Sequence, residues 1–472
     1  MSLVDALRDI VGAAHVIAEG DRSTWELDWR KRFRGRSLAV VRPGSTPEVA
    51  AIVAACRAHG ASLVAQGGNT GLVGGSVPDE SGSQVLLSMA RMNRIRSVDR
   101  SNLTLVAEAG CVLHAVQQEA AAHGLMFALS LAAEGSCTIG GNLSTNAGGT
   151  QVLRYGNARE LCLGLEAVTA EGRVWEGLSG LRKDNTGYDL RDLLIGSEGT
   201  LAIITAATLK LHPRPAAVMT ALASTRTLAA ATALLALAQR RLGPGLTGFE
   251  LMNDFSLGLV RKHLPQLRQP LAPAPWIVLL EHSDGESEAH ATEALEALLG
   301  EALEQGLIDD TAVAASLEQA NAMWHLRESI PIAQSMEGPN VKHDIALPVS
   351  AIEEFVAATD AALLAAFPGV RLVNFGHLGD GNLHYNVQGP PGLDGAAFLQ
   401  RHEAEINDRV YDAVSARGGS ISAEHGIGTL KLEQLEARKS PVALDMMRAI
   451  KLALDPQGVL NPGRVLRSPA RP

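Results

Sequence analysis

The stretch QGGNTGLVGGSVP, residues 66–78, contains five glycines in thirteen positions. Glycine adopts positive φ values without strain and leaves its backbone N–H group open to close approach. Successive N–H groups in such a loop form a concave anion-binding site, so the composition points to a bound phosphate or pyrophosphate. An ordinary structural loop fits the composition equally well. The stretch matches neither a Walker loop nor the G-x-G-x-x-G fingerprint of dinucleotide-binding folds.

The residues before this loop predict a strand–helix–strand unit. Residues 37–43, SLAVVRP, are strand-like. A helix is expected to begin with Thr46 as its N-cap and to end at Gly60. The next predicted strand, residues 61–66, runs directly into the glycine-rich loop, and a further apolar strand follows the loop. The loop is therefore predicted to connect two strands.

Two more segments rich in small residues follow in the chain. Residues 130–149, SLAAEGSCTIGGNLSTNAGG, carry few charges, as a backbone packed tightly against a flat ligand requires. Residues 196–200, GSEGT, run into a β-branched strand. Three such clusters in this order resemble the FAD-binding domain of the vanillyl-alcohol oxidase / p-cresol methylhydroxylase superfamily. The resemblance covers roughly residues 36–213.

This resemblance implies a role for each cluster. Residues 66–78 would wrap the FAD pyrophosphate, residues 130–149 would contact the isoalloxazine ring and ribityl chain, and residues 196–204 would line the other side of the flavin. Asn69 stands where some members of the superfamily carry a flavin-linked histidine, so a non-covalent FAD is expected. The residues implied to bind FAD are Gly67, Gly68, Asn69, Thr70, Gly71, Ser136, Thr138, Gly141, Asn142, Glu198 and Ile203.

The character of the chain changes after residues 213–215. Glycine becomes less frequent, and helical stretches rich in alanine and leucine alternate with short strands, which indicates a domain boundary. We expect an α+β fold with a two-subdomain FAD-binding domain of the vanillyl-alcohol oxidase type, residues 1–213. An α+β cap or substrate domain with an antiparallel sheet is expected over residues 214–450. Residues 451–472 are expected to return to the FAD domain.

Residues 373–387, VNFGHLGDGNLHYNV, carry two histidines seven residues apart around a turn of glycine, aspartate and asparagine. The flanking residues are strand-like, so His377 and His384 are predicted to face each other at a hairpin mouth. Further on, SAEHGIG contains Glu424 and His425. Catalytic zinc sites commonly use three histidine or carboxylate ligands, which predicts a metal held by His377, His384 and Glu424. His425 then suits a general base, whereas a structural histidine pair is the simpler alternative.

The segments GHLGDGNLH, SAEHGIG and DPQGVLNPG together resemble the FAD-linked D-2-hydroxyacid dehydrogenases, and this resemblance spans nearly the whole chain. That branch contains D-lactate dehydrogenases, glycolate oxidase catalytic subunits and D-2-hydroxyglutarate dehydrogenases. The resemblance implies a divalent metal, zinc, at the three ligands, His425 as the base, and Asn461 near the flavin. It implies oxidation of a D-2-hydroxy acid with hydride transfer to flavin N5.

Three further positions match substrate carboxylate-binding positions of the hydroxyglutarate enzymes: Arg327, Lys342 and Asn386. Taken alone, the two cations are ordinary surface charges. In this branch they favour a diacid, since arginine binds carboxylates with two donors, and so D-2-hydroxyglutarate is expected to become 2-oxoglutarate. Pro331 departs from the pattern, because it stands where a hydroxyl residue would help to bind the distal carboxylate. D-lactate or glycolate therefore stays open as the substrate.

Composition excludes several classes of protein. The net charge of −10 and pI near 5.8 argue against nucleic-acid binding. No stretch reads as a membrane span or a secretory signal, and the four cysteines match no zinc pattern, which predicts reduced thiols in a cytoplasmic protein. Without a nicotinamide fingerprint, the expected electron acceptor is an electron-transferring flavoprotein or a quinone. A homodimer is compatible with the sequence.

Two alternatives from other classes remain at this point. A non-catalytic FAD-binding subunit would not need the histidine and glutamate cluster. A metal-dependent hydrolase would leave the glycine clusters unexplained, and neither H-E-x-x-H nor G-x-S-x-G occurs.

Overall fold

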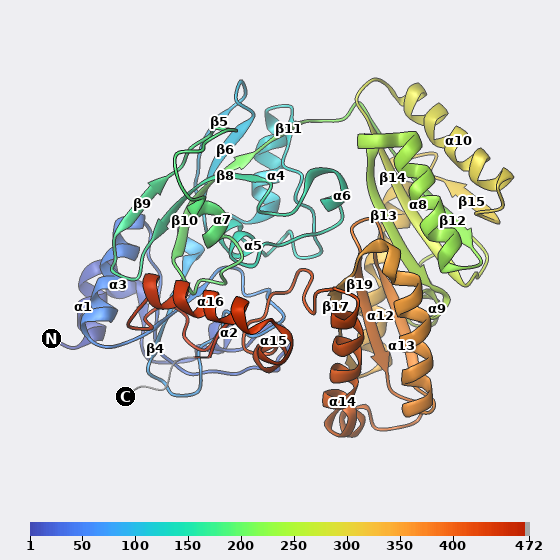
Figure 1. Cartoon of the computed structure of the whole chain (residues 1–472). Coiled ribbons are helices and arrows are strands. Elements are labelled where there is room, and N and C mark those ends of the chain that lie inside the picture. The colour runs from blue at the N-terminus through green and yellow to red at the C-terminus, as the bar shows by residue number, and fades with distance from the viewer. Residues whose placement is uncertain (468–472) are drawn as a thin grey trace. The chain divides into compact units, whose positions relative to one another are not determined.

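The computed structural model describes residues 1–467, which form two compact units (Figure 1). The first unit comprises residues 1–149, residues 156–214 and the chain from residue 424 onward. The second unit comprises residues 150–155 and 215–423. Both units combine helices with β-sheets, so the predicted α+β class is confirmed.

The first unit contains a four-stranded sheet whose three longer strands are parallel. Helix α3 (Thr46–Ala58) connects β2 to β3, and its buried face carries Val49, Ile52, Val53 and Cys56. Its N-cap is Ser45, one residue before the predicted cap, because the Ser45 hydroxyl accepts the Glu48 N–H at 3.4 Å from an extended backbone. The strand order is β1 (Val16–Ile17), β2 (Ser37–Val41), β4 (Gln84–Ser88) and β3 (Leu63–Gln66).

The second sheet of this unit has five antiparallel strands. Residues 196–200 lead into its central strand, so the third glycine cluster lies where that strand begins. The strand order is β5 (Ile95–Asp99), β6 (Thr104–Glu108), β10 (Ile203–Lys210), β8 (Cys162–Val168) and β9 (Val174–Gly177). The helices of this unit include α1 (Leu3–Val11), α2 (Ser23–Glu26), α4 (Leu113–Ala122), α5 (Ile139–Thr145) and α7 (Leu190–Leu194), and β7 (Leu125–Met126) pairs with β11 (His212–Pro213).

The C-terminal segment completes the first unit. After α15 (Leu432–Arg438) and α16 (Pro441–Leu454), Leu460 forms a parallel bridge beside Leu63 of β3. The Leu63 N–H donates to the Val459 carbonyl at 2.7 Å, and the Asn461 N–H donates to the Leu63 carbonyl at 2.8 Å. These bonds attach the C-terminal segment to the β3 edge of the parallel sheet.

The compact units divide the chain differently from the predicted domains at one end. The return to the first unit begins at Glu424, before the predicted position 451. The reason is that the N–H groups of Thr429 and Leu430 donate to the Val73 carbonyl, at 3.0 and 3.2 Å, inside the first glycine-rich loop. The short helix α6 (Val152–Tyr155) also changes unit, since it packs against β13 of the second.

The second unit is built on one large antiparallel sheet, as predicted. Its order is β15 (Asp310–Val313), β12 (Ala217–Thr225), β14 (Trp276–Asp284), β13 (Leu246–Asn253), β18 (Arg371–His377), β19 (Asn382–Gln388) and β16 (Asn340–Val341), with β17 (Asp344–Ala346) also paired to β19. Side chains alternate between the two faces of each strand, and the faces bury different cores.

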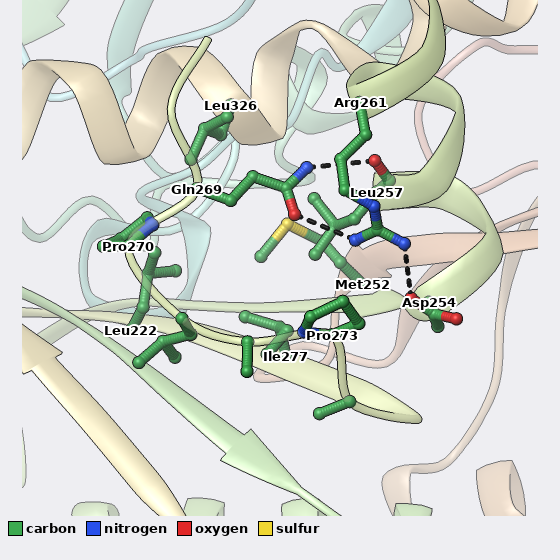
Figure 2. A pocket seen from close by; sticks show the side chains of 13 residues that line it. Leu222, Met252, Asp254, Leu257, Arg261, Gln269, Pro270, Pro273, Ile277 and Leu326 are labelled. Atoms are coloured by element: carbon green, nitrogen blue, oxygen red, sulfur yellow. Dashed lines mark hydrogen bonds and ion pairs between the residues drawn. The ribbon is translucent and has the colours of Figure 1, made fainter. Parts of the chain in front are cut away.

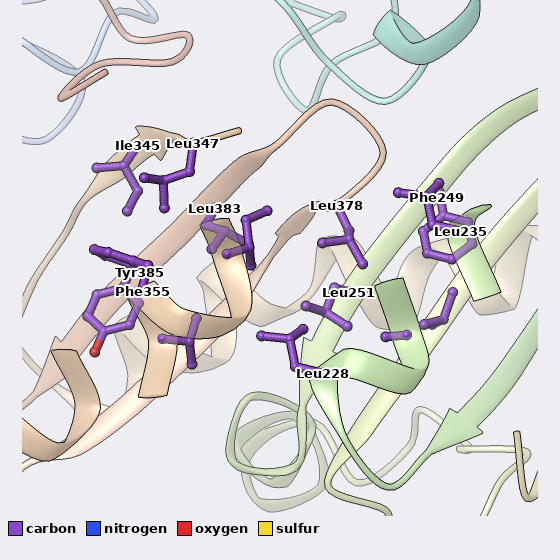
Figure 3. Close-up of a cluster of buried hydrophobic side chains, with 14 of the residues drawn as sticks. Leu228, Leu235, Phe249, Leu251, Ile345, Leu347, Phe355, Leu378, Leu383 and Tyr385 are labelled. Atoms are coloured by element: carbon purple, nitrogen blue, oxygen red, sulfur yellow. The ribbon is translucent and has the colours of Figure 1, made fainter. Parts of the chain in front are cut away.

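One face packs against α8 (Leu228–Leu242), α10 (Glu288–Glu304), α13 (Ile352–Ala366) and α14 (Gly395–Ala416). Figure 3 shows the buried cluster on this side, with Leu251, Leu383 and Tyr385 among its members. The opposite face packs against α9 (Asp254–His263), α11 (Leu317–Glu328) and α12 (Ile330–Glu337). Met252 and Phe375 lie on that second face. We call it the α11 face below.

Candidate active site

A pocket with about 920 Å³ of empty space, part of it open to solvent, lies in the first unit between the three glycine-rich clusters. It begins where β3 ends and is bounded by the start of α5 and by residues 198–204. Of the residues predicted to bind FAD, those lining the pocket are Gly67, Gly68, Asn69, Thr70, Gly71, Thr138, Gly141, Asn142, Glu198 and Ile203. His425, the predicted base, also lines it. Clusters separated by more than 100 residues thus form one cavity.

Two of the residues predicted to bind FAD, Ser136 and Asn461, contact the loops that form the pocket and do not line it. The Ser136 carbonyl packs against Gly68 so closely that a Cβ at position 68 would overlap it. The Asn461 side-chain amide donates to the carbonyls of Gly75 and Glu198, at 3.0 and 2.8 Å. Asn461 therefore ties the first glycine-rich loop to the third cluster.

Asn69 is held by the loop itself. Its Oδ1 accepts the Ser76 hydroxyl at 3.0 Å and its Nδ2 donates to the Leu27 carbonyl at 2.9 Å. Its backbone has φ of 53°, a left-handed conformation that asparagine tolerates better than most residues. The side chain at this position thus stabilises the loop conformation.

Glu198 anchors the loop that carries His425. The N–H groups of Ile427 and Gly428 donate to its two carboxylate oxygens at 2.7 and 2.8 Å. Burial raises the pKa of the Glu198 carboxyl, and the two N–H donors and the Lys431 charge oppose that rise. Because these donors follow His425 by two and three residues, Glu198 sets the path of the chain at the pocket wall.

Alanine at Gly71 is expected to weaken FAD binding by about ten- to a hundredfold without unfolding the protein. A Cβ at this position meets no described protein atom within 4 Å, yet it projects from a residue that lines the pocket. Filling space that a ligand occupies costs about 1–3 kcal/mol. FAD titration of the deflavinated variant, with its unfolding temperature, measures both effects. An unchanged FAD affinity would show that this backbone does not approach the cofactor.

In the second unit, strands β18 and β19 form the predicted hairpin. Phe375 lies opposite His384 in the register, and His377 lies opposite Asn382. The rings of His377 and His384 have centroids 5.6 Å apart, so the prediction that they face each other is confirmed. The turn requires glycine at position 381, where φ is 84° and a Cβ would overlap the Leu347 carbonyl.

Glu250 on β13 is a central residue of this site that the sequence analysis missed. Its two oxygens accept from His377 Nδ1 and from Arg327 Nε, each at 2.7 Å. Burial alone would raise the pKa of the Glu250 carboxyl, but His377 and Arg327 outweigh it and hold the pKa at about 2. The ionised Glu250 therefore orients the His377 imidazole and holds its proton on Nδ1. The only sequence signal was an acid within the apolar strand LTGFELM.

A second carboxylate lies beside His384. Asp344 Oδ1 is 3.9 Å from His384 Nδ1 and accepts the Asn382 side-chain amide at 2.9 Å. The Ala423 N–H donates to the Asp344 carbonyl at 3.2 Å. Glu424 is the next residue in the chain and the first residue of the returning segment. Each histidine of the pair therefore has its own buried carboxylate, which suits a pair of metal-binding imidazoles.

The three predicted substrate-binding residues all belong to the second unit. The Arg327 guanidinium lies 5.0 Å from the centre of the Phe375 ring, on the α11 face. Its Nη2 is buried and has no hydrogen-bond partner among residues 1–467. Asn386 lies two residues past His384 on β19 and accepts the His343 N–H at 3.0 Å. Lys342 is half-buried between β16 and β17.

A smaller pocket of the second unit, of about 360 Å³, lies beside α9 (Figure 2). Its Arg261 is paired with Asp254 and Gln269, at 2.7 and 2.9 Å, and Gln269 also donates to the Leu257 carbonyl. The remaining wall is apolar. These polar contacts hold the segment after α9 in place, and we assign no chemistry to this pocket.

Comparison with known proteins agrees with this arrangement. The family model described as "FAD binding domain" matches residues 37–177, and that described as "FAD linked oxidases, C-terminal domain" matches residues 214–465. The chain belongs to the FAD-linked oxidase family. It is an FAD-dependent oxidoreductase, and the hydrolase alternative is wrong.

Curated relatives of this FAD-linked oxidase match nearly its whole length. The mitochondrial D-2-hydroxyglutarate dehydrogenase of Arabidopsis thaliana is 40% identical over 98% of the chain and 81% of its own length. The mitochondrial D-2-hydroxyglutarate dehydrogenase of Bos taurus is 41% identical over 93% of the chain and 79% of its own length. The D-2-hydroxyglutarate dehydrogenase of Xanthomonas citri pv. viticola is 39% identical over 98% of the chain and 96% of its own length.

Solved structures share the fold of this FAD-linked oxidase at low sequence identity. The substrate-bound p-cresol methylhydroxylase structure matches with a TM-score of 0.77 at 16% identity, over 98% of this chain and 96% of that one. An alkyldihydroxyacetonephosphate synthase structure matches with a TM-score of 0.75 at 18% identity, over 98% and 85%. None of the helices within residues 1–467 combines the length and apolarity that a membrane crossing needs.

Proposed function

We propose that the protein oxidises D-2-hydroxyglutarate to 2-oxoglutarate. The observation that carries the proposal is Arg327, a buried cation with an unpartnered Nη2, on the same sheet face as the histidine pair. A buried unpaired donor of this kind suits a second carboxylate, at the end of the substrate away from the reacting carbon. Relatives at 39–41% identity carry the name of that dehydrogenase.

In this proposal, His377, His384 and Glu424 hold a divalent metal, zinc. The donor set fits, since Glu250 Oε1 accepts from His377 Nδ1 at 2.7 Å and the Asp344 carboxylate lies 3.9 Å from His384 Nδ1. Two imidazoles and a carboxylate are a common catalytic zinc set with an open position. A metal there would supply a positive charge that lowers the pKa of the substrate hydroxyl.

The remaining roles follow from the chemistry of dehydrogenation. His425 accepts the proton of the C2 hydroxyl, for which a neutral imidazole is suited. Arg327 and Lys342 bind the distal carboxylate, and Asn386 orients the substrate from β19. A non-covalent FAD, held by the residues of the three glycine-rich clusters, would supply an acceptor for the C2 hydride at its N5 atom. The hydroxy acid thus loses one proton and one hydride and leaves as the 2-keto acid.

Turnover of matched substrates with an artificial electron acceptor tests the proposal. D-2-hydroxyglutarate is expected to exceed D-lactate in kcat/KM by about a hundredfold, since charge-assisted hydrogen bonds contribute about 1.5–3 kcal/mol each. The L-enantiomer is expected to be inactive. A preference for D-lactate would support the second candidate, a monoacid dehydrogenase, which Pro331 favours because it offers no hydroxyl to a distal carboxylate.

Glutamine at Glu250 is expected to weaken metal binding by about 10- to 100-fold, because a neutral amide no longer holds the His377 proton on Nδ1. Metal content after dialysis against graded chelator measures the change. Glu281 on neighbouring β14 is a matched control. It is buried, and burial raises the pKa of its carboxyl. It accepts from Trp324 and Thr247 at 2.9 and 3.0 Å. Equal metal loss in E250Q and E281Q would contradict the role of Glu250.

Repeated turnover would require an external electron acceptor, and we propose an electron-transferring flavoprotein or a quinone for this role. We also propose a cytoplasmic location. All four cysteines are buried free thiols, and burial raises the pKa of Cys56 and of Cys162 to about 12. Such unreactive thiols suit a reducing compartment.

A further inference from the structure

Gln334 is a fully buried amide on α12 with an unused donor. Its exposed fraction is 0%, and its Nε2 has no hydrogen-bond partner among the described residues. Burying a polar group without a partner is costly, so a donor of this kind indicates a missing ligand. We propose that Gln334 binds the distal carboxylate of the substrate and selects diacids over monoacids. This inference rests on the proposed function and deepens it.

The orientation of the Gln334 amide follows from its neighbours. The backbone N–H of His343 can only donate, and it donates to Asn386 Oδ1 at 3.0 Å. The Asn386 amide therefore presents Nδ2, which donates to Gln334 Oε1 at 2.9 Å. The acceptor end of Gln334 is thus occupied, and the end without a partner is the N–H₂ group. That group can bind only an acceptor, such as a carboxylate oxygen.

The location of Gln334 also suits a distal carboxylate. Ser329 joins α11 to α12 in helical conformation, so the chain from Arg327 to Gln334 is nearly continuous helix. Residues seven apart on a helix share a face and lie about 10 Å apart along its axis. Arg327 carries another unpartnered buried donor, Nη2. The two donors therefore flank one stretch of the α11 face.

Strand β19 connects this stretch to the histidine pair. His384 and Asn386 are two residues apart, so both side chains project to the same side of the sheet, with Cα atoms about 7 Å apart. Gln334 contacts Asn386, whereas Arg327 lies over Phe375, whose ring is 4.8 Å from that of His384. A five-carbon diacid held at the histidines by its hydroxy-acid end would reach between the two donors.

Pro331 offers no hydrogen-bond donor to a carboxylate bound between Arg327 and Gln334. It lies one helical turn after Arg327 and one turn before Gln334, on the same face. Proline offers neither a side-chain donor nor an N–H group. Gln334 supplies the neutral donor from the next turn. A site that hydrogen-bonds a substrate group discriminates strongly against analogues that lack it, because its own buried groups are then left unpaired.

Methionine at Gln334 removes the donor at similar volume. The readout is kcat/KM for D-2-hydroxyglutarate divided by that for D-2-hydroxyvalerate, which has the same carbon chain and no distal carboxylate. The ratio is expected to fall by about ten- to a hundredfold, because this is the change in affinity that one charge-assisted hydrogen bond contributes. An unchanged ratio overturns the proposal. A glutarate inhibition constant that rises in parallel supports it without depending on turnover.

Gln388 provides the matched control. It is a buried glutamine on β19, two residues past Asn386, and its Nε2 already donates to the carbonyls of Gly338 and Pro339, at 3.1 and 3.4 Å. Its unpartnered atom is Oε1, an acceptor that cannot bind a carboxylate. Methionine at Gln388 is expected to preserve the substrate ratio. An equal fall in Q388M would show that any disturbance near β19 alters selectivity, and would overturn the role of Gln334.

Glutamate at Gln334 covers the case in which the methionine variant fails to fold. It keeps the oxygen that Asn386 needs and replaces the donor with a second oxygen. Q334E is expected to lose the diacid and keep D-2-hydroxyvalerate, and retained diacid preference overturns the proposal. A wild-type enzyme without diacid preference would refute the proposed function and, with it, the role of Gln334. Diacid preference that survives Q334M refutes the role of Gln334 alone.

Discussion

Alanine at His377 is expected to abolish metal retention and to lower kcat by about three orders of magnitude. His377 would supply one of three ligands, and its imidazole is held by the ionised Glu250 at 2.7 Å. Loss of the proposed metal would remove a positive charge that would stabilise the developing alkoxide by several kcal/mol, and about 4 kcal/mol corresponds to a thousandfold change in rate. Elemental analysis of the purified variant and steady-state turnover measure the two effects.

His402 serves as the control for this substitution. It lies half-buried on α14 of the same unit, and its ring packs on Phe367 and Phe398 at 5.4 and 5.2 Å. Alanine there removes an imidazole of equal size and is expected to preserve metal content and turnover. H377A protein that keeps its metal and full turnover would sink the metal-site assignment.

Alanine at Gly68 is expected to yield protein without flavin. A Cβ at this position would overlap the backbone carbonyl of Ser136, which cannot move away as a flexible side chain can. The first glycine-rich loop must then shift against the second cluster, at a cost of about 1–3 kcal/mol or more, and the pocket between them deforms. The visible absorbance of the purified variant measures bound flavin directly.

Gly135 is the matched position for this test. It is exposed, immediately precedes Ser136, and a Cβ there meets no described atom within 4 Å. Alanine at Gly135 is expected to retain flavin at the wild-type level. A G68A variant that is as yellow as wild type would mean that the close packing of these two clusters does not shape the cofactor pocket.

The parts of the site that depend on local sequence could be predicted. The glycine clusters are recognisable from their composition. Ten of the residues predicted to bind FAD line one pocket. The hairpin of His377 and His384 follows from strand-like residues on both sides of a glycine-rich turn, and β18 and β19 form that hairpin. The sequence signals for both features lie within stretches of about fifteen residues.

The parts that depend on pairing between distant segments could not be predicted. Glu250 reaches His377 only because β13 pairs with β18, and single-sequence periodicity does not reveal strand partners. The unpartnered N–H₂ group of Gln334 follows from the orientation of the Asn386 amide, which depends on a tertiary contact. The return of the chain at Glu424 likewise depends on backbone bonds to Val73, which carry no composition signal.

We propose that this FAD-linked oxidase removes a hydride from the C2 atom of a D-2-hydroxy diacid. A single anaerobic turnover of the flavin-loaded enzyme with D-2-hydroxyglutarate tests this reaction. The visible flavin band is expected to bleach, with one 2-oxoglutarate formed per flavin, whereas the L-enantiomer is expected to leave the flavin oxidised. A flavin that stays oxidised with the D-diacid, or one that bleaches equally with both enantiomers, would contradict the proposed reaction.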